Sequence, residues 1–167
     1  MGTESGSAAG AGTGLSVFSQ RSERLLCPQC LSFPNDLVKR LYLLLYYTLA
    51  QHFPTQPQPG WKFGYALRRI LLRKIAFRCG EEVVVKQHCY IGSGASLSVG
   101  DRSQLGHGAR IGPEVTIGND VLMGPDVVIM TTAHAFDDLE MPIRLQGSLP
   151  IQPVVIGNDV WLGTRVI

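Results

Sequence analysis

Residues 99–134 read VGDRSQLGHGARIGPEVTIGNDVLMGPDVVIMTTAH, and an aliphatic residue or Met recurs in this stretch at every sixth position. The recurring residues are Val99, Leu105, Ile111, Ile117, Met123 and Ile129, and the pattern resumes at Ile156 and Leu162. Glycine follows seven of these eight residues, and a small or branched residue stands four positions after each of them. A fixed period of this kind indicates a repeat architecture.

This spacing predicts how the side chains are arranged. One large apolar residue in every six must fill an interior, and the small or branched residue of each repeat points the same way. Glycine and the polar residues between them form a tight turn, because glycine lacks a Cβ and tolerates a positive φ. Three strands and three turns complete one coil, so successive coils stack as a triangular prism of parallel strands. An amphipathic α-helix is excluded, since six is not a multiple of 3.6.

The repeats have one offset and one interruption. Val85 and Ile91 fit the pattern but lie two residues out of register with Val99, which predicts a two-residue insertion near Leu97 and Ser98. After the hexapeptide that begins at Ile129, the segment 135–155 abandons the pattern. We therefore expect parallel strands over residues 81–167, interrupted by a loop at 135–155.

Composition restricts the class of protein. The chain has 167 residues, 45% of them hydrophobic and 17% charged, with a formal net charge of +2, which excludes a long, highly charged disordered protein. Its longest apolar run, Leu41 to Ala50, is far shorter than the roughly 20 residues that span a bilayer. The N-terminus lacks the pattern of a secretory signal peptide, and four cysteines are too few for a disulfide scaffold. We expect a cytoplasmic protein.

The N-terminal half differs from the repeats in charge, with ten Lys or Arg against three acidic residues in 1–80. Residues 1–35 begin with a low-complexity tract and are expected to be disordered. Residues 36–80 are expected to form helices over 36–53 and 64–77. The second helix has a basic face, made of Arg68, Arg69, Arg73 and Lys74. Such a helix can lie on the inner face of an anionic membrane; the favoured alternative is that both helices cover the end of the repeat domain.

Three motifs in the sequence are [LIV]-G-x-x-[STAV]-x, IGNDVLMGPDVVIMTTAHAF (117–136) and PVVIGNDVWLG (153–163). They resemble those of the hexapeptide-repeat O-acetyltransferases of maltose, galactoside and capsular polysaccharide type. PGWKFGYALRR, at residues 59–69, is similar to the segment that precedes the repeats in polysaccharide-type members. The resemblance implies a mainly β fold, a left-handed parallel β-helix preceded by α-helices. It also implies acetyl transfer from acetyl-CoA to a hydroxyl of a sugar or polysaccharide precursor, within a homotrimer and without metal or nucleic acid.

The resemblance assigns the catalytic base to His134, the last residue before the loop. A neutral imidazole can accept the proton of a hydroxyl as that hydroxyl attacks a thioester; the alternative is a surface histidine at a loop junction. Trp161 matches a family tryptophan that lines the acceptor or cofactor cleft. Asp137 and Gln146 are further substrate-binding candidates, and the group that orients the histidine stays open. An asparagine of the family is absent, since this chain has His107 in that region.

Two other kinds of site receive less support from the sequence. Cys27 and Cys30 form a single CxxC without a second pair, so the four cysteines are interpreted as ordinary thiols. A metal-dependent lyase would need three converging histidines, and the four histidines of this sequence lack a closely spaced pair. Because family members continue for further coils, we expect coils beyond Ile167 and most of the cofactor site there. The remaining alternative is a non-catalytic β-helix fragment that only trimerises or binds glycans.

Overall fold

The computed structural model describes residues 36–167, which form a mainly β structure with few helices; the expected disordered tail 1–35, with Cys27 and Cys30, lies outside the described residues. In chain order the elements are α1 (Asp36–Thr48), η2 (Ala50–His52), α2 (Trp61–Ile75), β1 (Arg78–Cys79), β2 (Val84–Val85), β3 (Ser98–Val99), β4 (Gln104–Leu105), β5 (Arg110–Ile111), β6 (Val115–Ile117), β7 (Leu122–Met123), β8 (Val128–Ile129), η3 (Ile143–Leu145), β9 (Val154–Ile156) and β10 (Trp161–Leu162).

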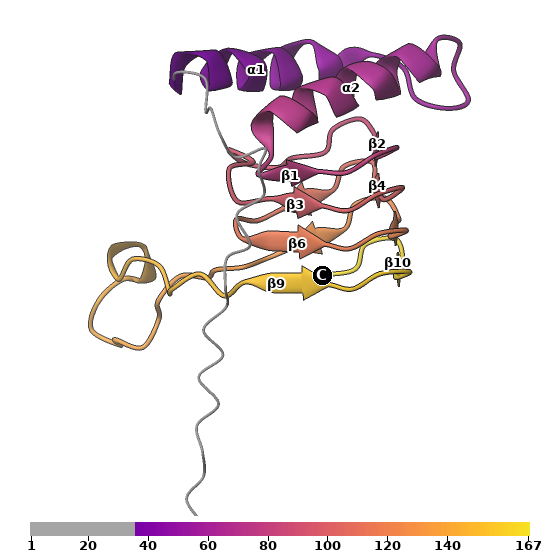
Figure 1. Ribbon diagram of the computed structural model, residues 1–167. Helices are drawn as coiled ribbons and strands as arrows, with labels where there is room; N and C mark the ends of the chain where they lie inside the picture. Colours follow the sequence, from indigo (N-terminus) through magenta and orange to yellow (C-terminus); the bar gives the residue numbers. More distant parts are fainter. Residues whose placement is uncertain (1–35) are drawn as a thin grey trace, which may run out of the picture. The chain divides into compact units, whose positions relative to one another are not determined.

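The strands form three parallel sheets that the chain visits in rotation (Figure 1). The first sheet has the order β1-β3-β6-β9, the second β2-β4-β7-β10, and the third pairs β5 with β8. Ser98 pairs with Thr116, three hexapeptides further along the chain, and β4–β7 and β5–β8 have the same offset. Each sheet therefore receives one strand from every third repeat.

The predicted insertion is confirmed by the first pairs of the three sheets. Arg78 pairs with Ser98, and Tyr90 forms a parallel bridge with Arg110, so the offset here exceeds three hexapeptides by two positions. Because β1, β2 and Tyr90 follow one another at six-residue steps, the two extra residues lie between Tyr90 and Ser98. The parallel sheets begin at Arg78, slightly before the expected boundary at 81.

The interior follows the six-residue pattern. The predicted core residues Leu105, Ile111, Ile117, Met123 and Ile129 are all buried. The small or branched residues Ser103, Ala109, Val115, Val121 and Val127 are buried with them. Ala133 was predicted to point inward but is exposed, because the chain turns away from the sheets there; Ile156 and Leu162 are only half-buried, since β9 and β10 are edge strands.

The seven glycines that follow the recurring residues from Val99 to Leu162 do not have positive φ, so that part of the prediction was wrong for them, whereas Gly92, after Ile91, has a φ of +57°. Positive φ falls instead on non-glycine residues two positions later, such as Arg102, Asp120 and Asp126. A Cβ built on Gly106 would collide with the carbonyl oxygen of Gly124, in the stacked turn of the next coil. Glycine is therefore required there because two backbones approach closely.

Both helices cover the end of the sheets next to β1 and β2, as the favoured interpretation predicted (Figure 1). The Tyr46 hydroxyl donates to the carbonyl of Cys89 at 2.9 Å, and the Tyr47 hydroxyl donates to that of Gly92 at 2.8 Å. Within residues 36–167, no helix has both the length and the apolar character needed to cross a membrane.

The predicted basic face of the second helix needs one correction, because Arg68 is fully buried. Its guanidinium donates to the carbonyls of Val85 (2.7 Å), Ala50 (2.9 Å), Phe53 (2.8 Å) and Pro54 (3.2 Å). Burial lowers the pKa of Arg68, yet a guanidinium stays charged in proteins. This side chain therefore joins α2, the 50–54 turn and β2.

Candidate functional site

His134 lies at the base of a projecting segment, residues 135–153, which we call the arm (Figure 1). The backbone of His134 forms an isolated antiparallel bridge with that of Ser148. On either side, the Leu149 amide donates to the Ala133 carbonyl (2.8 Å) and the Ala135 amide donates to the Gly147 carbonyl (3.1 Å). The arm is thus closed at its base by backbone pairing, and this pairing holds the backbone of His134 in place.

The imidazole of His134 is exposed to solvent, and its Nδ1 lies 3.4 Å from the carbonyl oxygen of Gly147. Gly147 has a φ of +84°, a left-handed conformation that favours glycine. A carbonyl oxygen accepts but cannot donate, so this contact favours the tautomer with the proton on Nδ1. Nε2 then carries a lone pair and can accept a proton. The Gly147 carbonyl is therefore a candidate for the group that orients His134, which the sequence left open.

The other predicted site residues do not join His134. The Gln146 side chain bonds within the arm: its Oε1 accepts from the Asp138 amide, and its Nε2 donates to the carbonyls of Asp138 (2.7 Å) and Met141 (2.6 Å). Trp161 is 77% exposed on β10, in the second sheet, and Asp137 is exposed on the arm. Among residues 36–167, no hydrogen bond or ion pair connects His134 to Asp137, Gln146 or Trp161.

Apolar side chains of the arm are uncovered. Leu139 is 94% exposed, and the other exposed members are Phe136, Met141, Ile143, Leu145, Leu149 and Ile151. A cluster of exposed apolar residues beside a candidate catalytic group is typical of a surface that contacts a partner.

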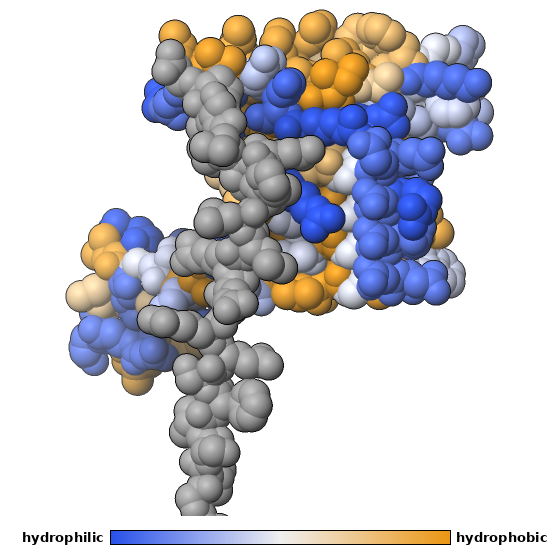
Figure 2. All heavy atoms as spheres, viewed as in Figure 1, coloured by the Kyte–Doolittle hydropathy of each residue, from blue (hydrophilic) through white to orange (hydrophobic). Residues whose placement is uncertain are grey.

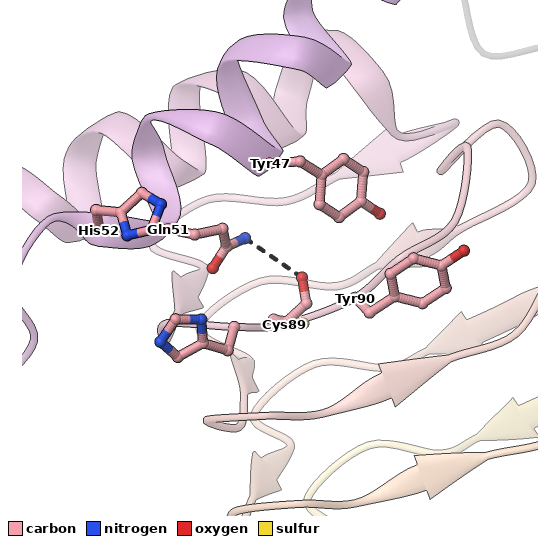
Figure 3. Close-up of a pocket in the computed structure, with 6 residues that line it drawn as sticks. Tyr47, Gln51, His52, Cys89 and Tyr90 are labelled. Carbon is pink, nitrogen blue, oxygen red and sulfur yellow. Dashed lines mark hydrogen bonds between the residues drawn. The ribbon is translucent and has the colours of Figure 1, made fainter.

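A separate cleft lies between the helices and the first strands (Figure 3). Its volume is about 230 Å³, and it is lined by Tyr47, Gln51, His52, His88, Cys89 and Tyr90. Gln51 Nε2 donates to the Cys89 carbonyl at 3.3 Å, while its buried Oε1 has no partner among the described residues. Burial raises the pKa of Cys89 to about 12 and, chiefly by the same cause, that of Tyr47 to about 12. Both groups are therefore neutral at neutral pH, and Cys89 is not an activated thiol.

Sequence reasoning missed a histidine pair beside this cleft. The rings of His88 and His107 meet edge to face at 5.3 Å and line a hollow of about 580 Å³ with Arg110 and Asp126. The number of residues from His88 to His107 is close to the number that separates paired residues of the first strands. This similarity was the signal in the sequence that could have predicted the pair. Within residues 36–167, no three His, Cys, Asp or Glu side chains are placed to hold a metal ion together.

Comparison with known proteins adds no assignment, since no protein family, curated protein or solved structure matches this chain.

Proposed function

We propose that the chain is an O-acetyltransferase built on a left-handed parallel β-helix, which transfers an acetyl group from acetyl-CoA to a hydroxyl of a sugar or polysaccharide precursor. The observation that carries the proposal is the exposed His134, at the interruption of the repeat and at the base of the arm, with Nδ1 facing the Gly147 carbonyl. The rotation of the strands through three parallel sheets and their offset of three hexapeptides support the β-helix.

In the proposed reaction His134 acts as a general base. Nε2 removes the proton of the acceptor hydroxyl as the hydroxyl oxygen attacks the thioester carbonyl. The tetrahedral intermediate carries an oxyanion, which backbone N–H groups stabilise. Its collapse breaks the C–S bond, the acetyl ester remains on the acceptor, and the imidazolium returns its proton to the leaving thiolate. The Gly147 carbonyl supports the imidazolium by accepting from Nδ1–H.

The remaining parts of the proposed site come from the arm and from β10. Trp161 offers an exposed indole face for acceptor or cofactor, and Asp137 offers a carboxylate to acceptor hydroxyls. Gln146 acts indirectly, by holding the arm in shape through Asp138 and Met141. A histidine on an exposed edge has no concave pocket of its own, whereas small-molecule sites are concave. A homotrimer in which each arm reaches a neighbour supplies such clefts.

The test is the His134→Ala substitution in the full-length protein, with His52→Ala as a matched control at another exposed histidine. Thiol release from acetyl-CoA is followed with a panel of sugar acceptors, and acetyl-CoA binding is measured by calorimetry. We expect His134→Ala to lower turnover by about 10²–10⁴-fold, the usual contribution of a general base, with little change in acetyl-CoA binding. Near wild-type turnover would contradict the role of His134. Glycan binding without acetyl transfer by the wild-type chain would favour the non-catalytic alternative.

A further inference from the structure

The outer face of α1 is apolar and uncovered in the part of the chain that the structure describes. Leu37, Leu41 and Leu44 are 76%, 51% and 57% exposed, and their spacing of four and three residues places them on one side of the helix. The opposite side carries the buried Tyr46 and leads into the buried Ala50. The helix therefore has two apolar faces, of which one packs on the sheets and α2. We call the other, Leu37, Leu41 and Leu44, the leucine ridge.

Cations outnumber carboxylates in the helical region that carries the leucine ridge. Residues 36–80 contain eight Lys or Arg and a single carboxylate, Asp36. Arg68 is buried, Arg40 pairs with Asp36, and Arg73 pairs with Glu81. The cations that have no ion pair within residues 36–167 are Lys39, Lys62, Arg69, Lys74 and Arg78.

Helix α2 adds exposed apolar residues among these cations. Phe63 and Ile70 of α2, and Phe77 just after the helix ends, are each more than half exposed, and α2 packs directly against α1. Figure 2 shows hydrophobic residues along the upper edge, where α1 lies, with hydrophilic residues directly below. The exposed surface of the two packed helices thus has apolar side chains, with the leucine ridge on α1, and unpaired cations, chiefly on α2.

We infer that α1 and α2 dock this surface on an anionic lipid bilayer, with the leucine ridge in the interface and the cations at lipid phosphates. Apolar side chains beside lysine and arginine are typical of helices that lie in the plane of a membrane surface. A second copy of the chain is a poorer occupant, because a symmetric contact would bring the two sets of like charges together. The sequence pointed to a basic face on the helix 64–77; the structure places the apolar ridge on α1.

The test is flotation of the full chain with vesicles of phosphatidylcholine alone and with vesicles that also contain phosphatidylglycerol. One variant replaces the leucine ridge (Leu37→Ser, Leu41→Ser, Leu44→Ser) and a second removes charge (Lys62→Gln, Arg69→Gln, Lys74→Gln). The controls are Val155→Ser, at an exposed apolar residue of β9, and Arg110→Gln, at an exposed cation of β5. Circular dichroism checks that each variant folds.

We expect the wild-type chain and both controls to float only with the anionic vesicles, and more weakly at high salt. The leucine variant should lower the partition coefficient by about tenfold or more. The charge variant should lower the partition coefficient by about fivefold for each cation removed. If the leucine variant does not fold, the charge variant alone tests the proposal. Equal binding to both vesicle types, or either folded variant floating like wild type, overturns the proposal. The proposal is also overturned if the wild-type chain does not float but forms a dimer that the leucine variant converts to monomer.

Discussion

Arg68 illustrates how an individual residue can be misjudged from its type. Arginine is almost never fully buried unless it is paired, and on a helical wheel Arg68 extends the basic face formed by its neighbours. In the structure its side chain points from α2 into the interior and donates to the carbonyls of Ala50, Phe53, Pro54 and Val85. Those carbonyls belong to the 50–54 turn and to β2, so one planar group with five N–H bonds serves several segments.

Replacing Arg68 should therefore destabilise the helices on the sheets. We expect Arg68→Met to lower the free energy of unfolding by about 3 kcal/mol, because it removes all four of these hydrogen bonds and takes the donor from the Val85 and Pro54 carbonyls. Arg68→Lys should recover little, since a single ammonium cannot reach carbonyls on both sides of the guanidinium plane. The neighbouring Arg69→Met is the control and should change stability by about 0.5 kcal/mol or less. Urea unfolding followed by circular dichroism measures all three, and a loss below about 1 kcal/mol for Arg68→Met would argue against this role.

The strands and turns of the repeat are joined by contacts between successive coils. Where strands of the first sheet end, the Oδ1 atoms of Asp101, Asn119 and Asn158 accept from the amides of Glu81, Asp101 and Asn119 at 2.7–2.8 Å. Figure 2 shows hydrophilic side chains stacked in a column at one edge of the sheets. These contacts satisfy backbone donors that the turns would otherwise leave unpaired.

The close approach of turns at the repeat glycines makes a direct prediction about the coils. Gly106→Ala should lower the free energy of unfolding by about 2 kcal/mol or more, because the new Cβ meets the Gly124 carbonyl and forces the two coils apart. Gly157→Ala is the matched control, since a Cβ there meets nothing within 4 Å. Thermal unfolding of the two variants distinguishes close packing from backbone freedom. If both variants lose stability equally, the glycines are required for a reason other than the approach of the coils.

The described part of the molecule exposes two apolar surfaces, the arm and the leucine ridge. They lie at opposite ends of the described chain: the helices cover β1 and β2, whereas the arm leaves between β8 and β9 (Figure 1). In the proposed function the arm builds a cleft with a neighbouring subunit, and in the separate inference on α1 and α2 the ridge lies on a lipid surface.

The arm should control assembly. We expect a trimer by analytical ultracentrifugation, and the double substitution Leu139→Ser and Ile143→Ser should weaken trimer formation by about tenfold or more, because each change removes buried apolar area from the contact. Leu44→Ser, on the leucine ridge, should leave the trimer intact. A wild-type monomer that turns over substrate at the same concentration would exclude a cleft shared between subunits.

Much of the fold could be predicted from the spacing of apolar residues. A large aliphatic side chain at every sixth position has to be buried, so Leu105, Ile111, Ile117 and Met123 could be assigned to the interior from the sequence, and the structure buries all four. The position of His134 at the interruption of the repeat followed in the same way. These properties are local, because a period and its break are set by neighbours along the chain.

The properties that could not be predicted depend on which turns become neighbours in space. The burial of Arg68 and the placement of His134 Nδ1 against the Gly147 carbonyl each join segments that are distant or irregular in sequence. Their geometry is set when coils stack and helices pack, since only then are backbone carbonyls removed from water and in need of donors. The six-residue period alone does not specify which donor meets which carbonyl, so these contacts are decided only in the folded chain.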